Sequence, residues 1–128
     1  MPAYVAEGVI APFLNADVPV EFYRLRKDLT PDIAGLRRRL DQRASPSIVV
    51  LIHYFGYPSP VDPVRREVDA VGGLLLEDCA LALAGSTTDG APLGATADFA
   101  LYSLNKFLPV TEDVYKRQAL AVLQPRRA

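Results

Sequence analysis

Three side chains with complementary chemistry lie at the ends of two apolar runs. Asp78 follows three leucines in GLLLEDC (73–79), and Ser103 and Lys106 lie at and just beyond the end of DFALYSL (98–104). Taken singly, each has an ordinary interpretation: a helix cap, a turn cap and a solvated loop lysine. Together they supply what pyridoxal 5'-phosphate (PLP) requires, namely an amine to attach it, a carboxylate for its pyridine nitrogen and a hydroxyl for its phosphate. The combination favours a PLP site.

A histidine and a cysteine lie near the same strand ends. His53 is near the end of the apolar run SIVVLIHYF (47–55), and Cys79 follows Asp78. They are the single histidine and the single cysteine of the chain, so we expect no metal site and no internal disulfide. A histidine at a strand end is more often a core residue than a catalyst. A lone cysteine fits a reducing, cytoplasmic location.

The elements that must position these residues alternate along the chain. Continuous apolar runs predict buried strands, and helical spacing of apolar residues predicts amphipathic helices. The predicted strands are 18–25, 47–55, 73–79 and 98–104, and the predicted helices are 6–17, 30–42 and 61–73. This order predicts an α/β fold of three layers (αβα) with a mostly parallel sheet. Ligands of such sheets bind at the carboxyl ends of the strands.

Composition excludes several classes of function. Of 128 residues, 50% are hydrophobic, and the net charge is −1, which suits one domain or a piece of one. A chain without a basic excess is not expected to bind nucleic acid, and no apolar run is long enough to span a membrane.

The segment LLLEDCALALAGSTTDGAPLGATADFALYSLNKFLPV (74–110) resembles the DegT/DnrJ/StrS family of PLP-dependent sugar aminotransferases, of the aspartate aminotransferase (fold type I) superfamily. The start of the chain and SIVVLIHYFGYPSPVDPV (47–64) resemble earlier parts of the same family, in the same order. The resemblance covers Pro2 to about Thr111. It implies an aminotransferase that acts on a keto-sugar nucleotide, uses glutamate as amino donor and forms a homodimer.

The resemblance also assigns roles to residues. It implies that Asp78 pairs with the pyridinium nitrogen of PLP, that Ser103 binds the phosphate and that Lys106 carries the cofactor and transfers protons. His53 corresponds to a family histidine near the cofactor. One departure is Leu81, where the family has a polar cofactor contact.

Departures of this kind keep two alternatives open. The first is a PLP-fold protein that binds or regulates without transamination. The second, which sets the resemblance aside, is a small flavodoxin-like α/β domain that binds a ligand.

The resemblance further implies that the chain is an internal slice of a longer enzyme, inactive by itself. Residues 1–112 would be part of the large domain. The word DVYKRQ (113–118) is the translation of GATGTGTATAAGAGACAG, the mosaic end of a transposon used to prepare sequencing libraries. We hypothesise that 113–118 is translated adapter, and that 119–128 is either the resuming native strand or unrelated sequence.

Overall fold

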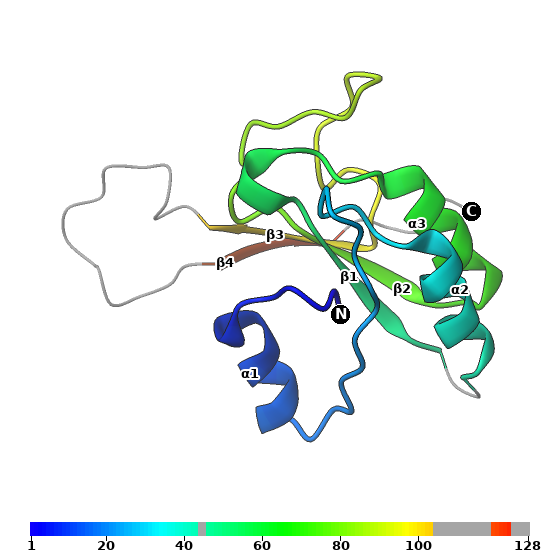
Figure 1. The fold of residues 1–128 in the computed structure, drawn as a ribbon. Coiled ribbons are helices and arrows are strands. Elements are labelled where there is room, and N and C mark those ends of the chain that lie inside the picture. Colours follow the sequence, from blue (N-terminus) through cyan, green and yellow to red (C-terminus); the bar gives the residue numbers. More distant parts are fainter. Residues whose placement is uncertain (44–45, 104–118, 124–128) are drawn as a thin grey trace.

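The computed structural model describes residues 1–43, 46–103 and the backbone of 119–123. It is a mixed α/β fold built on one sheet of four strands (Figure 1). The elements are α1 (Glu7–Asn15), α2 (Ile33–Asp41), β1 (Ile48–Ile52), the 3-10 helix η1 (Tyr54–Gly56), α3 (Val61–Ala70), β2 (Leu74–Asp78), β3 (Phe99–Ser103) and β4 (Ala119–Leu123). None of the helices in the described ranges is long and apolar enough to cross a membrane.

The three strands that precede the candidate site residues are parallel. The sheet order is β1-β2-β3-β4, with β2 parallel to both β1 and β3 and with β4 antiparallel to β3. The first three strands confirm the predicted parallel sheet. Their carboxyl ends lie along one edge, so the residues that follow them come together there.

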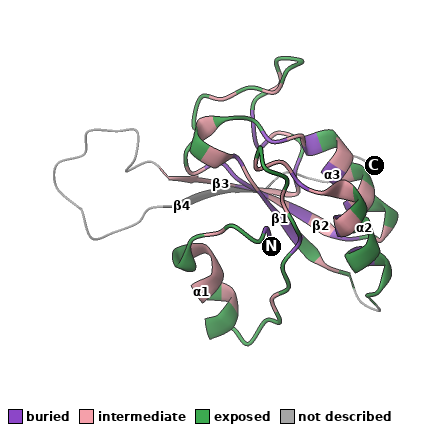
Figure 2. Cartoon of the chain, in the orientation of Figure 1, coloured by how far each residue is buried: buried purple, intermediate pink, exposed green. Residues whose placement is uncertain are grey.

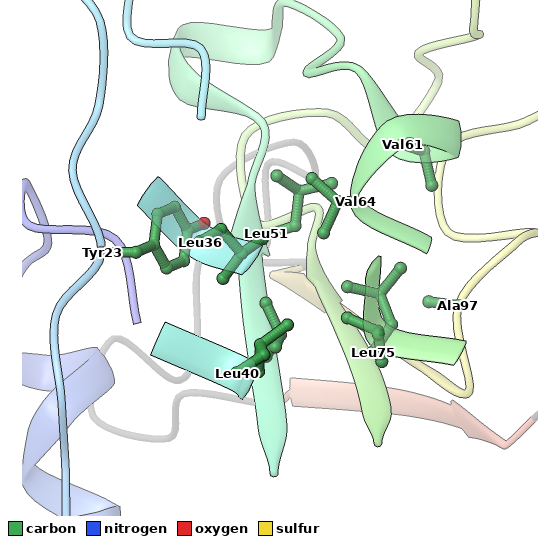
Figure 3. Packing of buried hydrophobic residues seen from close by; sticks show 10 residues of the cluster. Tyr23, Leu36, Leu40, Leu51, Val61, Val64, Leu75 and Ala97 are labelled. Carbon is green, nitrogen blue, oxygen red and sulfur yellow. The ribbon is translucent and has the colours of Figure 1, made fainter. Parts of the chain in front are cut away.

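One face of the sheet forms the main core. Val49, Leu51 and Leu75 point toward α2 and α3, because alternate residues of a strand share a face. Figure 3 shows how these side chains pack against the helices. The residues that the helices contribute are Leu36, Leu40, Val61, Val64 and Val68. Burial is concentrated in β1, β2 and this face of the helices, whereas α1 carries no buried residue (Figure 2).

A buried ion pair fastens the start of β3. Asp98 Oδ2 accepts hydrogen bonds from Arg65 Nη1 of α3 and from the Leu75 amide of β2, each at 2.7 Å. Both charged side chains are largely buried, with 15% and 10% of their surface exposed. Removal of one partner from such a pair typically costs about 3–5 kcal/mol. Asp98 therefore fixes β3 against β2 and α3.

Compared with the predicted ranges, α3 begins at the same residue, α1 begins one residue later and α2 begins three residues later. The sequence predicts Thr30 as the N-cap of the second helix, but Asp32 is the cap and accepts a hydrogen bond from the Gly35 amide at 3.2 Å. Thr30 instead bonds to Asp28. Asp and Thr are both good N-caps, and here the Thr30 hydroxyl is occupied by Asp28 while Asp32 caps the helix.

The predicted strand 18–25 is wrong. This segment forms isolated bridges from Tyr23 to Pro2 and from Leu25 to Pro31 instead of a ladder with β1. Pro19 lacks the N–H that a ladder needs. The segment is attached to the sheet by a side chain, because the buried Tyr23 hydroxyl donates to the Val50 carbonyl at 2.8 Å.

The last strand, β4, belongs to the C-terminal segment 119–128. The backbone of β4 pairs with β3 over five residues, from Phe99 opposite Leu123 to Ser103 opposite Ala119. Whether 119–128 is the resuming native strand or unrelated sequence stays a prediction. The suspected adapter, 113–118, lies outside the described residues, so its origin stays a prediction.

Sequencing of the genomic locus tests that prediction. We expect amplification from source DNA to give a gene that lacks the stretch encoding Asp113–Gln118, because that stretch matches the transposon end in frame. An uninterrupted gene that encodes DVYKRQ at this position would show that the word is native.

Candidate functional site

The predicted site lies at the carboxyl edge of the parallel strands. Asp78, the last residue of β2, lies opposite Ile52 of β1 and Leu101 of β3. Ser103 follows Leu101 by two residues, so alternation places Asp78 and Ser103 on the same face of the sheet. The structure thus brings two of the predicted cofactor residues to one face of one edge. Lys106 lies outside the described residues.

Asp78 is a buried carboxylate. The residue is 5% exposed, and its Oδ1 accepts a hydrogen bond from the Ala80 amide at 2.9 Å. In the described part of the chain, Asp78 forms no salt bridge with a cationic side chain. A buried carboxylate is costly unless a cation or further donors compensate it. The site therefore suits a positively charged ligand group.

An aromatic pair adjoins this carboxylate. Tyr54 of η1 packs against Tyr4, with ring centroids 5.7 Å apart and ring planes inclined by 37°, and its hydroxyl donates to the Tyr4 carbonyl. Burial, and then the negative charge of Asp78, raise the pKa of Tyr54 to about 12. The phenol is therefore neutral at physiological pH and remains a hydrogen-bond donor beside the acid.

The loop after β1 turns sharply to reach this position. Phe55 and Gly56 both have positive φ, +55° and +85°. A Cβ at Gly56 would lie 2.8 Å from the carbonyl oxygen of Leu81, which belongs to the loop that follows Asp78. Glycine is thus required here for two reasons, its φ and the close approach of the two loops.

Replacement of Gly56 with alanine is expected to lower the free energy of unfolding by about 2–4 kcal/mol, the sum of strain in φ and a backbone contact that cannot relax. Gly90 is a matched control, because its φ is +86° but nothing lies within 4 Å of its added Cβ. Gly90→Ala should cost about 1 kcal/mol. Denaturant unfolding of both variants measures the difference, and equal losses would contradict the close approach.

His53 lies on the other face of the sheet. Its Nε2 is 2.8 Å from Glu77 Oε2, and its Nδ1 accepts a hydrogen bond from the Ser59 amide at 3.0 Å. Glu77 precedes Asp78 in β2, so the two carboxylates point to opposite faces. His53 and Glu77 are both fully buried. Direct contact of His53 with a cofactor stays a prediction.

The hydrogen bonds of His53 also determine its tautomer. A backbone N–H can only donate, so Nδ1 bears the lone pair and the ring proton is on Nε2. Ligand atoms of His53, Glu77 and Cys79 lie within 4.8 Å of one another, which is a spacing that could hold a metal ion. A protonated Nε2 has no lone pair for a metal. Burial, and then the charges of Glu77 and Asp78, raise the pKa of Cys79 to about 12, so its thiol is a poor ligand too.

One site partner was not predicted from the sequence. Glu77 Oε2 also accepts a hydrogen bond from the Gly94 amide at 2.8 Å, which ties the turn before β3 to the end of β2. The sequence contained an indication that Glu77 has such partners. A glutamate inside the apolar run GLLLEDC needs buried hydrogen-bond partners, and strand alternation puts its side chain on the face of His53.

Comparison with known protein families gives one match. The family model of the DegT/DnrJ/EryC1/StrS aminotransferases matches residues 15–112. A comparison with curated protein sequences gives no significant match.

Similar solved structures cover most of this chain. The aminotransferase TlmJ from Streptoalloteichus hindustanus is 24% identical with a TM-score of 0.71, and the match covers 80% of this chain and 27% of that one. A GDP-4-keto-6-deoxy-D-mannose-3-dehydratase from E coli with bound hydrated PLP is 20% identical, with a TM-score of 0.69, over 80% and 26%. DesV from S. venezuelae, in complex with a ketimine intermediate, is 24% identical, with a TM-score of 0.63, over 80% and 27%. The chain spans about a quarter of the length of these proteins.

The parallel sheet of β1, β2 and β3 matches part of the fold of PLP-dependent transferases. Within that class, the chain belongs to the DegT/DnrJ/EryC1/StrS aminotransferase family, whose model matches more than half of it. This membership confirms the family predicted from the sequence and favours it over a flavodoxin-like domain.

Proposed function

We propose that the protein to which this chain belongs is a PLP-dependent aminotransferase that transfers an amino group from glutamate to a keto-sugar nucleotide. Family membership supports the aminotransferase class, and the relatives in the structural comparison include enzymes whose names specify PLP or a keto-sugar nucleotide. We further propose a cytoplasmic homodimer. The chain by itself is expected to be inactive, because it spans about a quarter of those enzymes.

The buried carboxylate of Asp78 is the observation that carries the proposal. Its burial at the edge of the sheet, without a cationic partner among the described side chains, fits a ligand that presents a protonated ring nitrogen. Ser103 lies on the same face, two residues past the register partner of Asp78. The donor set therefore fits PLP.

Each proposed residue has a defined role. Bound PLP supplies an electron sink for the charge that develops at the substrate α-carbon. Asp78 would hold a proton on the pyridine nitrogen, and the Ser103 hydroxyl would donate to the phosphate. The Lys106 amine would take a proton from the substrate α-carbon as a base and would return it as an acid.

A half-reaction assay tests the proposal. The full-length protein, loaded with PLP, should lose its visible absorbance when glutamate is added and regain it when a keto-sugar nucleotide is added. A panel of sugar nucleotides would identify the acceptor. A protein that binds no PLP, or whose spectrum does not respond to any amino donor, would contradict the proposed activity.

One residue favours a second candidate function, a PLP-fold protein without transaminase activity. Leu81 stands where the resemblance expects a polar cofactor contact, and 42% of its surface is exposed. The same assay separates the candidates, because a binding protein would take up PLP but show no response to glutamate.

A further inference from the structure

Glu77 joins three segments of the carboxyl edge at one buried point. Its Oε2 bonds to His53, which follows β1, and to the Gly94 amide, which precedes β3. Through Nδ1 of His53 the same network reaches the Ser59 amide in the loop before α3. Breaking either hydrogen bond to this oxygen would leave a buried polar group unpaired, which is costly. The oxygen therefore restrains the positions of both donors.

The turn that contains Gly94 is also held against β3 by a hydrogen bond. The Tyr102 hydroxyl donates to the Leu93 carbonyl at 2.6 Å. A Cβ at Gly94, whose φ is +86°, would lie 2.3 Å from that hydroxyl and 2.7 Å from Ala100 Cβ. Tyr102 is the neighbour of Ser103, so the contacts lead from Glu77 through this turn to the strand that bears the proposed phosphate ligand.

We propose that Glu77 and His53 are positioning residues, which set Asp78 relative to Ser103 from the opposite face of the sheet. Asp78 and Glu77 are consecutive in β2, so the position of one side chain limits the other. The effect on cofactor binding rests on the proposed function. The effect on the Gly94 turn does not.

The two oxygens of Glu77 differ in a way that provides a matched pair of variants. Oε2 accepts two hydrogen bonds, whereas Oε1 has no partner among the described residues. Glutamine can place its carbonyl oxygen at Oε2 and its amide where Oε1 lies. Glu77→Gln therefore keeps both bonds without the charge, and Glu77→Met fills a similar volume without either bond.

The experiment compares these variants in the full-length protein by two measurements. Hydrogen exchange, resolved to peptides, reports the turn around Gly94, and a titration followed by absorbance gives the dissociation constant for PLP. In Glu77→Met we expect the hydrogen-exchange rate at the turn and the dissociation constant for PLP each to rise about tenfold or more. A change of this size is expected when a buried hydrogen bond to a charged group is lost. In Glu77→Gln both should stay within about threefold of wild type.

A further variant separates positioning from a general loss of stability. Val68 of α3 is fully buried in the core, and it lies beside Gly73, at the amino end of β2. Val68→Ala should lower stability but leave the PLP dissociation constant unchanged. If Glu77→Met binds PLP as wild type does, or if Glu77→Gln is as weak as Glu77→Met, the positioning role is wrong. If wild type binds no PLP, the proposed function fails, and exchange at the turn still decides whether Glu77 holds Gly94.

Discussion

Replacement of Lys106 with alanine in the full-length protein is expected to abolish transamination and the visible absorbance of bound PLP. The proposed role gives this one amine two tasks, covalent attachment of the cofactor and proton transfer at the substrate α-carbon. Proton transfer by a positioned side chain contributes about 10²–10⁴-fold to a rate. We therefore expect the rate to fall by at least about 10³-fold, measured as amino-sugar product formed with saturating glutamate and PLP.

Lys106→Arg is the matched variant for this prediction. Arginine keeps the positive charge and much of the length, but its guanidinium does not lose a proton in proteins and cannot act as a nucleophile. If the charge of Lys106 were all that mattered, Lys106→Arg would retain activity and Lys106→Ala would not. If both variants lost nearly all activity, the result would support the role of the Lys106 amine. Turnover near the wild-type rate in either variant would show that Lys106 takes no part in the mechanism.

Much of the sheet could be predicted because its strands are continuous apolar runs in the sequence. The runs 47–55 and 73–79 contain β1 and β2, and 98–104 contains β3, with errors of a few residues at their ends. Continuous apolar runs mark such strands clearly. The failure at 18–25 has a physical cause. Alternation predicted a strand, but strand pairing depends on the backbone donors of this segment, and proline removes one of them.

The site could be predicted in part, for a related reason. Asp78 and Ser103 were recognised as residue types near strand ends, and parallel register then brings them to one face. The partners of Glu77 are backbone amides, and the sequence does not indicate which amide a buried acid will meet. The tautomer of His53 is likewise set by the amide of Ser59, six residues away, through the turn at Gly56.

Replacement of Asp78 with asparagine is the second prediction with a large effect. Asparagine is nearly isosteric, and its carbonyl oxygen can still accept the hydrogen bond from the Ala80 amide. It has no negative charge, however, and cannot hold a proton on the pyridine nitrogen of the cofactor. We expect kcat to fall by about 10²-fold or more, the usual effect of removing one preorganised electrostatic partner, measured with PLP at saturation.

Two controls show whether this loss belongs to the site. Glu77→Gln removes the adjacent charge on the opposite face of β2, and Asp62→Asn removes an exposed charge in the first turn of α3. Asp62→Asn should leave kcat within about twofold of wild type, because exposed charges distant from the site have small effects. A value of kcat for Asp78→Asn near that of wild type would mean that no cationic ring meets this carboxylate, and the proposed PLP site would have to be abandoned. A large loss in Asp78→Asn with little loss in Glu77→Gln would place the catalytic charge on the face of Asp78 and Ser103, since the two acids are adjacent in the chain and differ mainly in the face to which they point.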